Sequence, residues 1–328
     1  MLINRSWVEH AWELVRDWRH SGQYPDRPES LNFEITGACD ARCIHCPRLD
    51  MDRPMKQMQP ELFRRLIDQA ADLGVPYLCP NGYGEICTMP LPALEEYLAY
   101  MAGEVRRFKD NHRFKVVLNT NGNRMTDERA RLFIKYRVHV VNVTIDGATA
   151  ATAESIRRNL HFDQIEANIK HLLDLRAEAG VPRPMLRVGM VAMPQTMPEI
   201  PAFFERWTGV ADAVGIGAFS TRLAAVSDTW RKGSGGAEPP GPGHVNACVL
   251  PFRDLNIWSD GVAVICCEDW NESMPAGDLK TQSLSEIWHG PVLTRAREQH
   301  RAGKGHSIDI CAKCSVWHRP SRAVRLWA

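Results

Sequence analysis

Residues 31–46 read LNFEITGACDARCIHC, and this stretch decides how the rest of the chain is interpreted. It begins with a short alternating apolar run, which predicts a β-strand. Cys39, Cys43 and Cys46 follow, separated by three and two residues. We therefore expect them in a loop at the carboxyl end of a strand, where barrel enzymes assemble their active sites. Three thiolates this close together can hold three corners of a four-iron cluster and leave the fourth iron open for catalysis.

A structural zinc site is the alternative interpretation of these three cysteines. Structural zinc takes four protein ligands, and the nearest candidates for the fourth are His45 and Cys79. Either of them would have to break the geometry of the loop. The trio therefore favours an iron–sulfur cluster that takes part in a reaction.

The chain from residue 31 to about residue 220 alternates short β-branched runs with longer amphipathic segments. This pattern is typical of βα units around a parallel sheet. Six units fall short of the eight in a closed barrel, so we predict an α/β fold with a partial (β/α)6 TIM barrel. The predicted strands are Leu31 to Thr36, Val75 to Cys79, Phe114 to Asn119, His139 to Ile145, Met185 to Ala192 and Ala213 to Phe219. The predicted helices span residues 59–74, 91–108, 126–136, 151–178 with a break near Asn159, and 197–208.

A stretch rich in Gly and Pro, RKGSGGAEPPGPGH at residues 231–244, ends this alternation and marks a domain boundary. The predicted domains are an N-terminal helical segment (1–30), the partial barrel (31–225), a linker (226–247) and a small α+β module (248–328).

Local patterns predict the elements of the C-terminal module. Residues 255–258 and 262–266 flank a turn at Gly261 and predict a β-hairpin. A single helix is predicted over residues 283–303, with Glu286 completing a capping box at its start.

Four cysteines distinguish this module: Cys248-x17-Cys266, and Cys311-x2-Cys314 in a loop after the helix. A module this small buries little core, so a metal centre is expected to contribute folding energy. A four-cysteine zinc site and a four-iron cluster suit these ligands equally well on chemistry alone.

Composition excludes some classes of protein. The 40 Lys and Arg residues balance 39 Asp and Glu residues, so no net field attracts nucleic acid or an anionic membrane. No apolar run approaches the ~18 residues of a membrane span, and the first residues lack a signal-peptide core. We therefore expect a cytoplasmic protein that binds neither nucleic acid nor a membrane. Ten cysteines in that compartment indicate metal or redox chemistry rather than disulfides.

The cysteine trio, with His45 directly before its last member, resembles the signature of the radical S-adenosylmethionine (SAM) superfamily. Gly82-Tyr83-Gly84-Glu85 is similar to the family segment that receives the methionyl amino group of SAM. Asn119-Thr120-Asn121-Gly122 and Thr144-Ile145-Asp146-Gly147 end later strands, as family segments that face SAM do. Four such motifs in order are not easily produced by chance. The SAM-binding residues implied by the resemblance are Gly82, Gly84, Glu85, Asn119, Asn121, Thr144, Asp146, Met190, and Arg157 or Arg158 on the following helix for the SAM carboxylate.

The resemblance covers about residues 31–220 and implies a catalytic [4Fe-4S] cluster on Cys39, Cys43 and Cys46. It also implies reductive cleavage of SAM to a 5'-deoxyadenosyl radical that abstracts a hydrogen atom from a small-molecule substrate. A flavodoxin or ferredoxin is the implied electron donor. The C-terminal module resembles the twitch extension, a shortened SPASM domain, and this implies a second [4Fe-4S] cluster on Cys248, Cys266, Cys311 and Cys314.

Three cysteines remain. Cys79 and Cys87 are expected to be buried apolar fillers. Strand alternation points Cys267 away from Cys266 and therefore toward the barrel mouth. There it would be a catalytic hydrogen-atom donor, because an S–H bond is weaker than the C–H bond of a sugar carbinol. The string Cys-Cys-Glu-Asp at residues 266–269 is also similar to SPASM-like domains of other activities, so this role stays open.

Three reactions follow from the resemblance. The first is epimerisation of a small natural product, an aminoglycoside or other sugar-containing antibiotic, as in radical enzymes such as the neomycin epimerase. The second is dehydrogenation with the auxiliary cluster as electron acceptor, as in the butirosin enzyme. The third is peptide modification, which ranks lower because we expect no leader-recognition domain before residue 31. A zinc-structural protein without activity would require the ordered motifs to be accidental.

Overall fold

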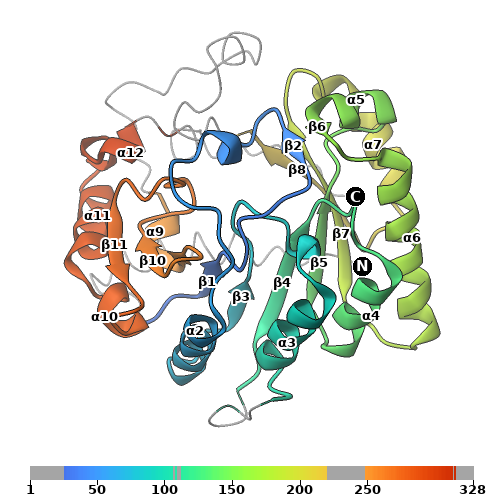
Figure 1. Ribbon diagram of the computed structural model, residues 1–328. Helices are drawn as coiled ribbons and strands as arrows, with labels where there is room; N and C mark the ends of the chain where they lie inside the picture. The colour runs from blue at the N-terminus through green and yellow to red at the C-terminus, as the bar shows by residue number, and fades with distance from the viewer. Residues whose placement is uncertain (1–25, 106–107, 109–111, 220–247, 313, 315–328) are drawn as a thin grey trace.

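The computed structural model of the chain describes residues 26–105, 108, 112–219, 248–312 and 314. Within these residues the central element is a nine-stranded sheet with the order β11-β10-β9-β1-β3-β4-β5-β7-β8. Six of its strands follow one another in chain order, all parallel, and helices cover their outer face (Figure 1). This confirms the predicted partial barrel. These strands are β1 (Ser30–Phe33), β3 (Tyr77–Cys79), β4 (Lys115–Thr120), β5 (Val140–Thr144), β7 (Met185–Ala192) and β8 (Ala213–Ala218).

Alternation along the strands separates the two faces of the sheet. On β5, Val141 and Val143 are fully buried, whereas Asn142 between them is only half-buried. On β7, Val188 is buried and its neighbour Arg187 is exposed. Because successive side chains of a strand point to opposite faces, the apolar half forms the core beneath the helices. The polar half lines the concave side.

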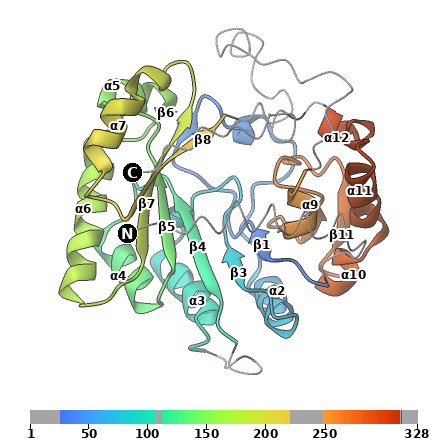
Figure 2. The same ribbon diagram turned by 180° about the vertical axis from the view of Figure 1, so that it is seen from behind.

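Amphipathic helices pack on the convex face of the sheet, as the view from behind shows (Figure 2). They are α2 (Pro60–Asp72), α3 (Leu91–Met101), α4 (Asp127–Lys135), α5 (Ala150–Ile156), α6 (Phe162–Glu178) and α7 (Ile200–Trp207). Short turns of 3-10 helix are η1 (Pro47–Asp50), η2 (Ile86–Thr88), η4 (Met197–Glu199) and η6 (Gly305–Ser307). The α3 helix is shorter than the predicted 91–108, because Gly103 adopts a φ of 75° just beyond its end.

The predicted break near Asn159 is confirmed, and it is larger than expected. Asn159 has a φ of 69°, which separates α5 from α6. The residues before it form a short strand, β6 (Arg157–Arg158), that pairs antiparallel with β2 (Arg42–Cys43). Placing the two arginines on a helix was therefore wrong. Backbone pairing instead ties them to the loop that carries the cysteine trio.

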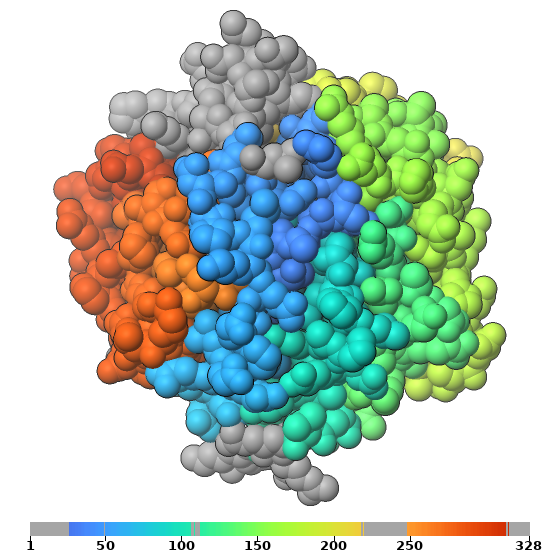
Figure 3. Space-filling model, viewed as in Figure 1, coloured from blue at the N-terminus to red at the C-terminus, as the bar shows by residue number. Residues whose placement is uncertain are grey.

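The C-terminal module extends the barrel sheet. Its strands are β9 (Asp254–Ile257), β10 (Val262–Val264) and β11 (Pro275–Asp278). β9 and β10 form the predicted hairpin, and Gly261 has a φ of 94° in its turn. β9 also pairs in parallel with β1, which the sequence did not predict. In the space-filling view the chain that follows β1, in blue, lies directly against the orange module (Figure 3).

The helices of the module depart from the single predicted helix over 283–303. Two helices occupy this range, α10 (Leu284–Trp288) and α11 (Pro291–Arg301). Gly290 is extended, with a φ of −63° and a ψ of 159°, and Pro291 starts the second helix. A proline removes a backbone donor from a helix interior and is favoured at its first position. The capping box of Ser283 and Glu286 is confirmed. Short helices α9 (Leu250–Arg253) and α12 (Asp309–Ala312) complete the module, so Cys311 lies in a helix and not in the predicted loop.

The domain boundaries 31–225 and 248–328 stay predictions. The predicted linker 226–247, and residues 1–25 of the predicted N-terminal helical segment, lie outside the described residues.

Candidate active site and cysteine centres

Cys39, Cys43 and Cys46 all belong to the loop between β1 and α2, and each is half-buried. The pairing of β2 with β6 holds Cys43 opposite Arg157, and the backbone N–H of Cys46 donates to the Cys43 carbonyl oxygen at 3.1 Å. The Arg157 Nη1 atom lies 3.9 Å from Cys43 Sγ. Burial raises the pKa of Cys39 to about 12 and raises the pKa of Cys43. Such thiols deprotonate when a cationic centre replaces their protons, so the residues fit a metal cluster.

Asp146 connects the cysteine loop to the ends of two strands. It is fully buried with a left-handed φ of 62°. Its Oδ2 accepts from Arg157 Nε at 2.7 Å, and its Oδ1 accepts from the backbone N–H of Val191 at 2.7 Å. His45 Nε2 lies 3.7 Å from the same carboxylate. Asp146 therefore fixes the Arg157 guanidinium beside Cys43.

The glycine-rich segment has a packing role that the sequence did not reveal. A Cβ atom on Gly82 would lie 2.5 Å from the Glu34 side chain, and one on Gly84 would lie 1.8 Å from the Thr36 carbonyl oxygen. These glycines are required because the segment crosses the end of β1 in direct contact with it. The predicted approach of this segment to SAM stays a prediction beside this contact within the chain.

Glu85 is buried and fully engaged by its own chain. Its carboxylate accepts from Thr120 Oγ1 at 2.7 Å, from Asn121 N at 2.7 Å and from Cys87 N at 3.0 Å. Burial raises the pKa of Glu85. The carboxylate thus joins the loops after β3 and β4, and its predicted contact with SAM stays a prediction.

The other candidates for SAM binding fall in different environments. Asn121 is buried and donates to Asp40 Oδ1 at 2.7 Å. Thr144 is half-buried and Arg158 is exposed. Met190 is only 1% exposed and packs in the core beneath the helices. Its predicted SAM contact does not agree with this position, because strand alternation points it to the convex face.

A layer of polar side chains lines the concave face below these loops. Asn119, Asn142 and Arg187 are in register on neighbouring strands, and Asn142 Nδ2 donates to Asn119 Oδ1 at 2.8 Å. Asn142 Oδ1 is buried and has no hydrogen-bond partner within the described part of the chain. A Cβ atom on Gly215 would lie 2.3 Å from the Arg187 guanidinium, so the glycine makes room for it. Buried polar atoms without partners are rare, and such a group suits a polar ligand.

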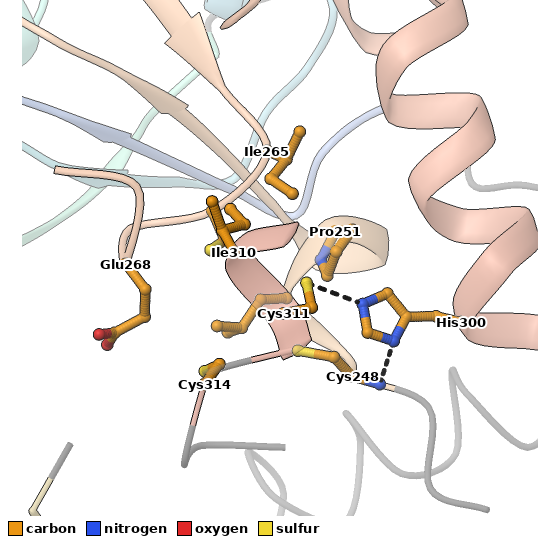
Figure 4. Close-up of a pocket in the computed structure, with 10 residues that line it drawn as sticks. Cys248, Pro251, Ile265, Glu268, His300, Ile310, Cys311 and Cys314 are labelled. Carbon is orange, nitrogen blue, oxygen red and sulfur yellow. Dashed lines mark hydrogen bonds between the residues drawn. The ribbon is translucent and has the colours of Figure 1, made fainter. Parts of the chain in front are cut away.

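A second group of thiols surrounds a small cavity in the C-terminal module. Cys248, Cys266, Cys311 and Cys314 all line it, together with His300 (Figure 4). Within the described ranges, no three Cys, His, Asp or Glu side chains converge as the ligands of one metal ion would. The four thiols instead face a common enclosed volume.

The electrostatics of this cavity fit a cationic cluster. Burial raises the pKa of Cys311 to about 12, and it raises the pKa of Cys248 and Cys266. Neighbouring thiolates raise the pKa of each further. Four buried thiolates without counter-charge would be strongly unfavourable. A cluster that binds them as thiolates removes that cost.

Cys267 lies beside this cavity and not in its wall. The lining includes Cys266 and Glu268, on either side of it in the chain. β10 ends at Val264, and the Asp269 N–H donates to the Cys266 carbonyl oxygen at 3.1 Å in a turn. The argument from strand alternation was therefore wrong, since the turn sets the direction of Cys267.

A buried ion pair joins the cysteine loop to the C-terminal module. The Arg53 guanidinium donates to both carboxylate oxygens of Glu34, at 2.7 and 2.8 Å. Ser259 Oγ and the Tyr83 N–H donate to the same carboxylate, at 3.0 and 2.9 Å. Arg53 Nε also donates to the Trp270 carbonyl oxygen at 2.7 Å. Nothing in the sequence marked Glu34 or Arg53, because a single buried pair has no motif.

Of the remaining cysteines, Cys87 is fully buried in the apolar core, where we expected it as a filler. Cys79 is half-buried, with Sγ 3.5 Å from Ser30 Oγ.

An open parallel barrel with three cysteines in the loop after its first strand, and a thiol-lined cavity in an attached module, is the arrangement of an iron–sulfur enzyme. The family model of the radical SAM superfamily matches residues 33–206, more than half of the chain. The chain belongs to the radical SAM superfamily. A model described as an iron-sulfur cluster-binding domain, the SPASM domain, matches residues 248–315. Members bind SAM with a [4Fe-4S] cluster, and the second domain binds auxiliary clusters, as the sequence predicted.

Curated relatives share parts of the chain. It is 29% identical to the AdoMet-dependent heme synthase of Methanosarcina barkeri over 131 residues, covering 40% of this chain and 34% of that protein. It is 29% identical to the S-adenosyl-L-methionine-dependent 2-deoxy-scyllo-inosamine dehydrogenase of Niallia circulans over 69 residues, covering 21% and 28%. The chain spans about a third of the length of the relatives it matches.

Solved structures share the fold over most of the chain. BtrN in complex with AdoMet and 2-DOIA superposes with a TM-score of 0.58 at 17% identity, covering 88% of this chain and 92% of BtrN. Streptococcus suis SuiB bound to the precursor peptide SuiA gives 0.63 at 13% identity, covering 90% and 73%. In the part of the chain that the structure describes, no helix has both the length and the apolar character to cross a bilayer.

Proposed function

We propose that the chain is a radical SAM epimerase that inverts a carbon centre of a small natural product, an aminoglycoside or another sugar-containing antibiotic. The position of Cys267 carries this proposal. It adjoins Cys266 without lining the cavity of the four thiols, and its carbonyl oxygen accepts a hydrogen bond from Tyr83 of the glycine-rich segment. A candidate hydrogen-atom donor is thus attached to elements of both proposed cofactor sites.

In the proposed reaction one thiol, that of Cys267, gives up a hydrogen atom and is then restored. When bound, SAM and its cluster supply the radical that removes a hydrogen atom from one face of the substrate carbon. The Cys267 thiol then gives its hydrogen atom to the other face, so a C–H bond forms as the S–H bond breaks. An iron–sulfur reductant and water return one electron and one proton to the sulfur.

The cofactor assignments form part of the proposal. Arg157, held by Asp146 next to Cys43, is suited to the SAM carboxylate, because a guanidinium offers paired donors to two oxygens. Cys39, Cys43 and Cys46 would hold the catalytic cluster, and Cys248, Cys266, Cys311 and Cys314 the auxiliary one.

The polar layer on the concave face supports a polar substrate. Arg187 forms no ion pair with an acidic side chain of the described residues, and partial desolvation of its guanidinium lowers its pKa. Its N–H donors suit the hydroxyl or carboxylate oxygens of a sugar derivative, and the neighbouring Asn142 Oδ1 accepts no hydrogen bond from the described residues. Gly215→Ala would push Arg187 aside and should raise the KM for substrate more than it lowers kcat.

Turnover in deuterated water by the reconstituted protein tests the reaction. Epimerisation through an exchangeable thiol places one solvent deuterium at the inverted carbon. Cys267→Ala should keep SAM cleavage and lose the inverted product, whereas Cys79→Ala, the matched control, should keep both. If the Cys267→Ala variant still formed inverted and deuterated product, Cys267 would not be the hydrogen-atom donor.

Dehydrogenation is the second candidate. A relative of this chain is named as a 2-deoxy-scyllo-inosamine dehydrogenase, and BtrN was solved with 2-DOIA. In that reaction the substrate radical loses a proton and passes an electron to the auxiliary cluster. The same experiment separates it, because the product would be oxidised and would carry no new deuterium at the reacting carbon.

Peptide modification is the third candidate. A relative in Bacillus subtilis, 30% identical over 156 residues, is named as the subtilosin biosynthesis protein AlbA, and SuiB was solved with its precursor peptide. Mass spectrometry of a co-expressed precursor peptide would detect the change. For all three reactions we propose a cytoplasmic enzyme reduced by a flavodoxin or ferredoxin.

A further inference from the structure

A buried histidine lies in the wall of the auxiliary cavity. His300, on α11, is 2% exposed and lines the same volume as the four thiols. Its two ring nitrogens reach two of the proposed ligands (Figure 4). The Cys248 backbone N–H donates to Nδ1 at 3.3 Å, and Nε2 lies 3.4 Å from Cys311 Sγ.

The contact with Cys248 fixes the position of the ring hydrogen. A backbone N–H can only donate, so Nδ1 of His300 is the acceptor and carries no hydrogen. A neutral imidazole then carries its single hydrogen on Nε2. Nε2 is therefore the donor, and the sulfur of Cys311 is the acceptor.

Neighbouring contacts hold the ring in this place independently of any cluster. Arg297, one turn before His300 on α11, is 1% exposed. Its Nε donates to the Pro251 carbonyl oxygen at 2.8 Å, and its Nη1 donates to the Trp288 carbonyl oxygen at 2.7 Å. The first bond fastens α11 to α9, which follows Cys248, and the second fastens it to α10. The imidazole is thus set against the thiols by the fold.

We propose that His300 is a positioning residue that donates an N–H···S hydrogen bond to the Cys311 thiolate of the auxiliary cluster and raises the reduction potential of that cluster. The proposal rests on the four-cysteine assignment made above. Reduction adds negative charge to the cluster and its sulfur ligands, so a donor on one sulfur stabilises the reduced form more than the oxidised form. His300 thereby sets how readily the auxiliary centre accepts an electron.

The test is a redox titration of the auxiliary cluster in the reconstituted, SAM-bound enzyme, followed by electron paramagnetic resonance. His300→Leu removes the donor, and at a fixed potential the ratio of reduced to oxidised cluster should fall about tenfold, equal to about 59 mV for one electron. His300→Gln can place an amide N–H near the position of Nε2 and should recover much of the loss. His300→Asn is too short to reach Cys311 and should behave as His300→Leu. His289→Leu, an exposed histidine between the two helices, is the control.

Iron content and nitrogen coupling make the outcomes distinct. The comparison is made on variants that retain about eight irons per chain. Equal reduction potentials in the wild type and in His300→Leu would overturn the proposal. So would equal decreases of the reduction potential in His300→Gln and His300→Asn. If the Leu variant does not load, the Gln and Asn pair decides the result. Pulsed electron paramagnetic resonance with ¹⁵N-labelled histidine should show a weak coupling between the His300 nitrogen and the reduced auxiliary cluster, and the variants should lose it. A strong coupling would mean that the nitrogen coordinates iron instead. A wild type with only about four irons would refute the four-cysteine assignment itself.

Discussion

The phenolic hydroxyl of Tyr83 donates a 2.6 Å hydrogen bond to the carbonyl oxygen of Cys267, which is 184 residues away in the chain. The Tyr83 ring also packs on Trp258, with ring centroids 5.6 Å apart. Tyr83 lies in the segment that resembles the SAM-binding motif, and Cys267 lies in the turn after β10. The Tyr83 side chain therefore sets the position of Cys267, the candidate hydrogen-atom donor, relative to the predicted SAM site.

Replacing this hydroxyl should affect turnover and spare cofactor loading. Tyr83→Phe should lower product formation by about tenfold, because the turn that carries Cys267 loses one partly buried hydrogen bond. Iron content and SAM cleavage without substrate should stay at wild-type values. Tyr100→Phe removes a similar bond, to Asp68, far from the site and is the control. A normal turnover rate in Tyr83→Phe would show that the bond does not position the donor.

Of the ion pairs described above, the pair of Glu34 and Arg53 should contribute most to the free energy of unfolding. Glu34→Gln should destabilise the protein by about 3–5 kcal/mol, because the buried Arg53 guanidinium loses the carboxylate at 2.7 Å and keeps only Glu272, whose Oε1 lies 3.9 Å from Nε. Glu96→Gln breaks an exposed pair with Arg64 and should cost at most about 1 kcal/mol. Urea denaturation of both variants measures the difference. Equal losses would argue against a structural role for the buried pair.

The two cysteine groups should be separable by iron analysis. Cys248→Ala should lower the iron content from about eight to about four per chain while SAM cleavage persists. Cys79→Ala should keep about eight irons, since Cys79 lies on β3 outside both groups. Loss of all iron in Cys248→Ala would mean that the two centres do not assemble independently.

His139 should make stability depend on pH in the mildly acid range. Burial lowers its pKa from 6.5 to about 4 in the fold. The unfolded chain thus binds this proton more tightly, so the free energy of unfolding should decrease as pH falls from about 6.5 toward 4 and be unaffected above that range. His139→Gln should flatten this part of the profile. Denaturation midpoints at pH 7 and pH 5 for both proteins check it, and parallel profiles would assign the slope to other groups.

Much of the barrel could be predicted because each strand has a local signature. All six predicted barrel strands exist, and the turn at Gly261 and the cap at Ser283 are where the sequence placed them. The pairing of β1 with β9 could not be predicted, since it joins residues more than two hundred positions apart and depends on which sheet edge is open. The break at Gly290 was missed because the apolar period continues across it.

The parts of the candidate site that depend on the spacing of residues along the sequence could be predicted. The parts that depend on contacts between distant side chains could not. Cysteine spacing indicated both thiol groups, and the family models agree with two iron–sulfur modules. Glu85 matched a motif, yet its carboxylate is bonded to Thr120 and Asn121. His300 had no signal at all, because a histidine within a helix becomes a sulfur contact only after α11 and α12 have packed.

The parallel pairing of β1 with β9 also constrains how the chain is made. Ser30 to Phe33 find their partners at residues 254–257, so one edge of the barrel sheet stays open until most of the polypeptide has left the ribosome. Pairing over so great a separation is slow, and an unpaired strand edge is a template for aggregation. Removing the C-terminal module would leave β1 permanently open. A shortened enzyme kept for its first cluster alone should therefore accumulate as insoluble protein.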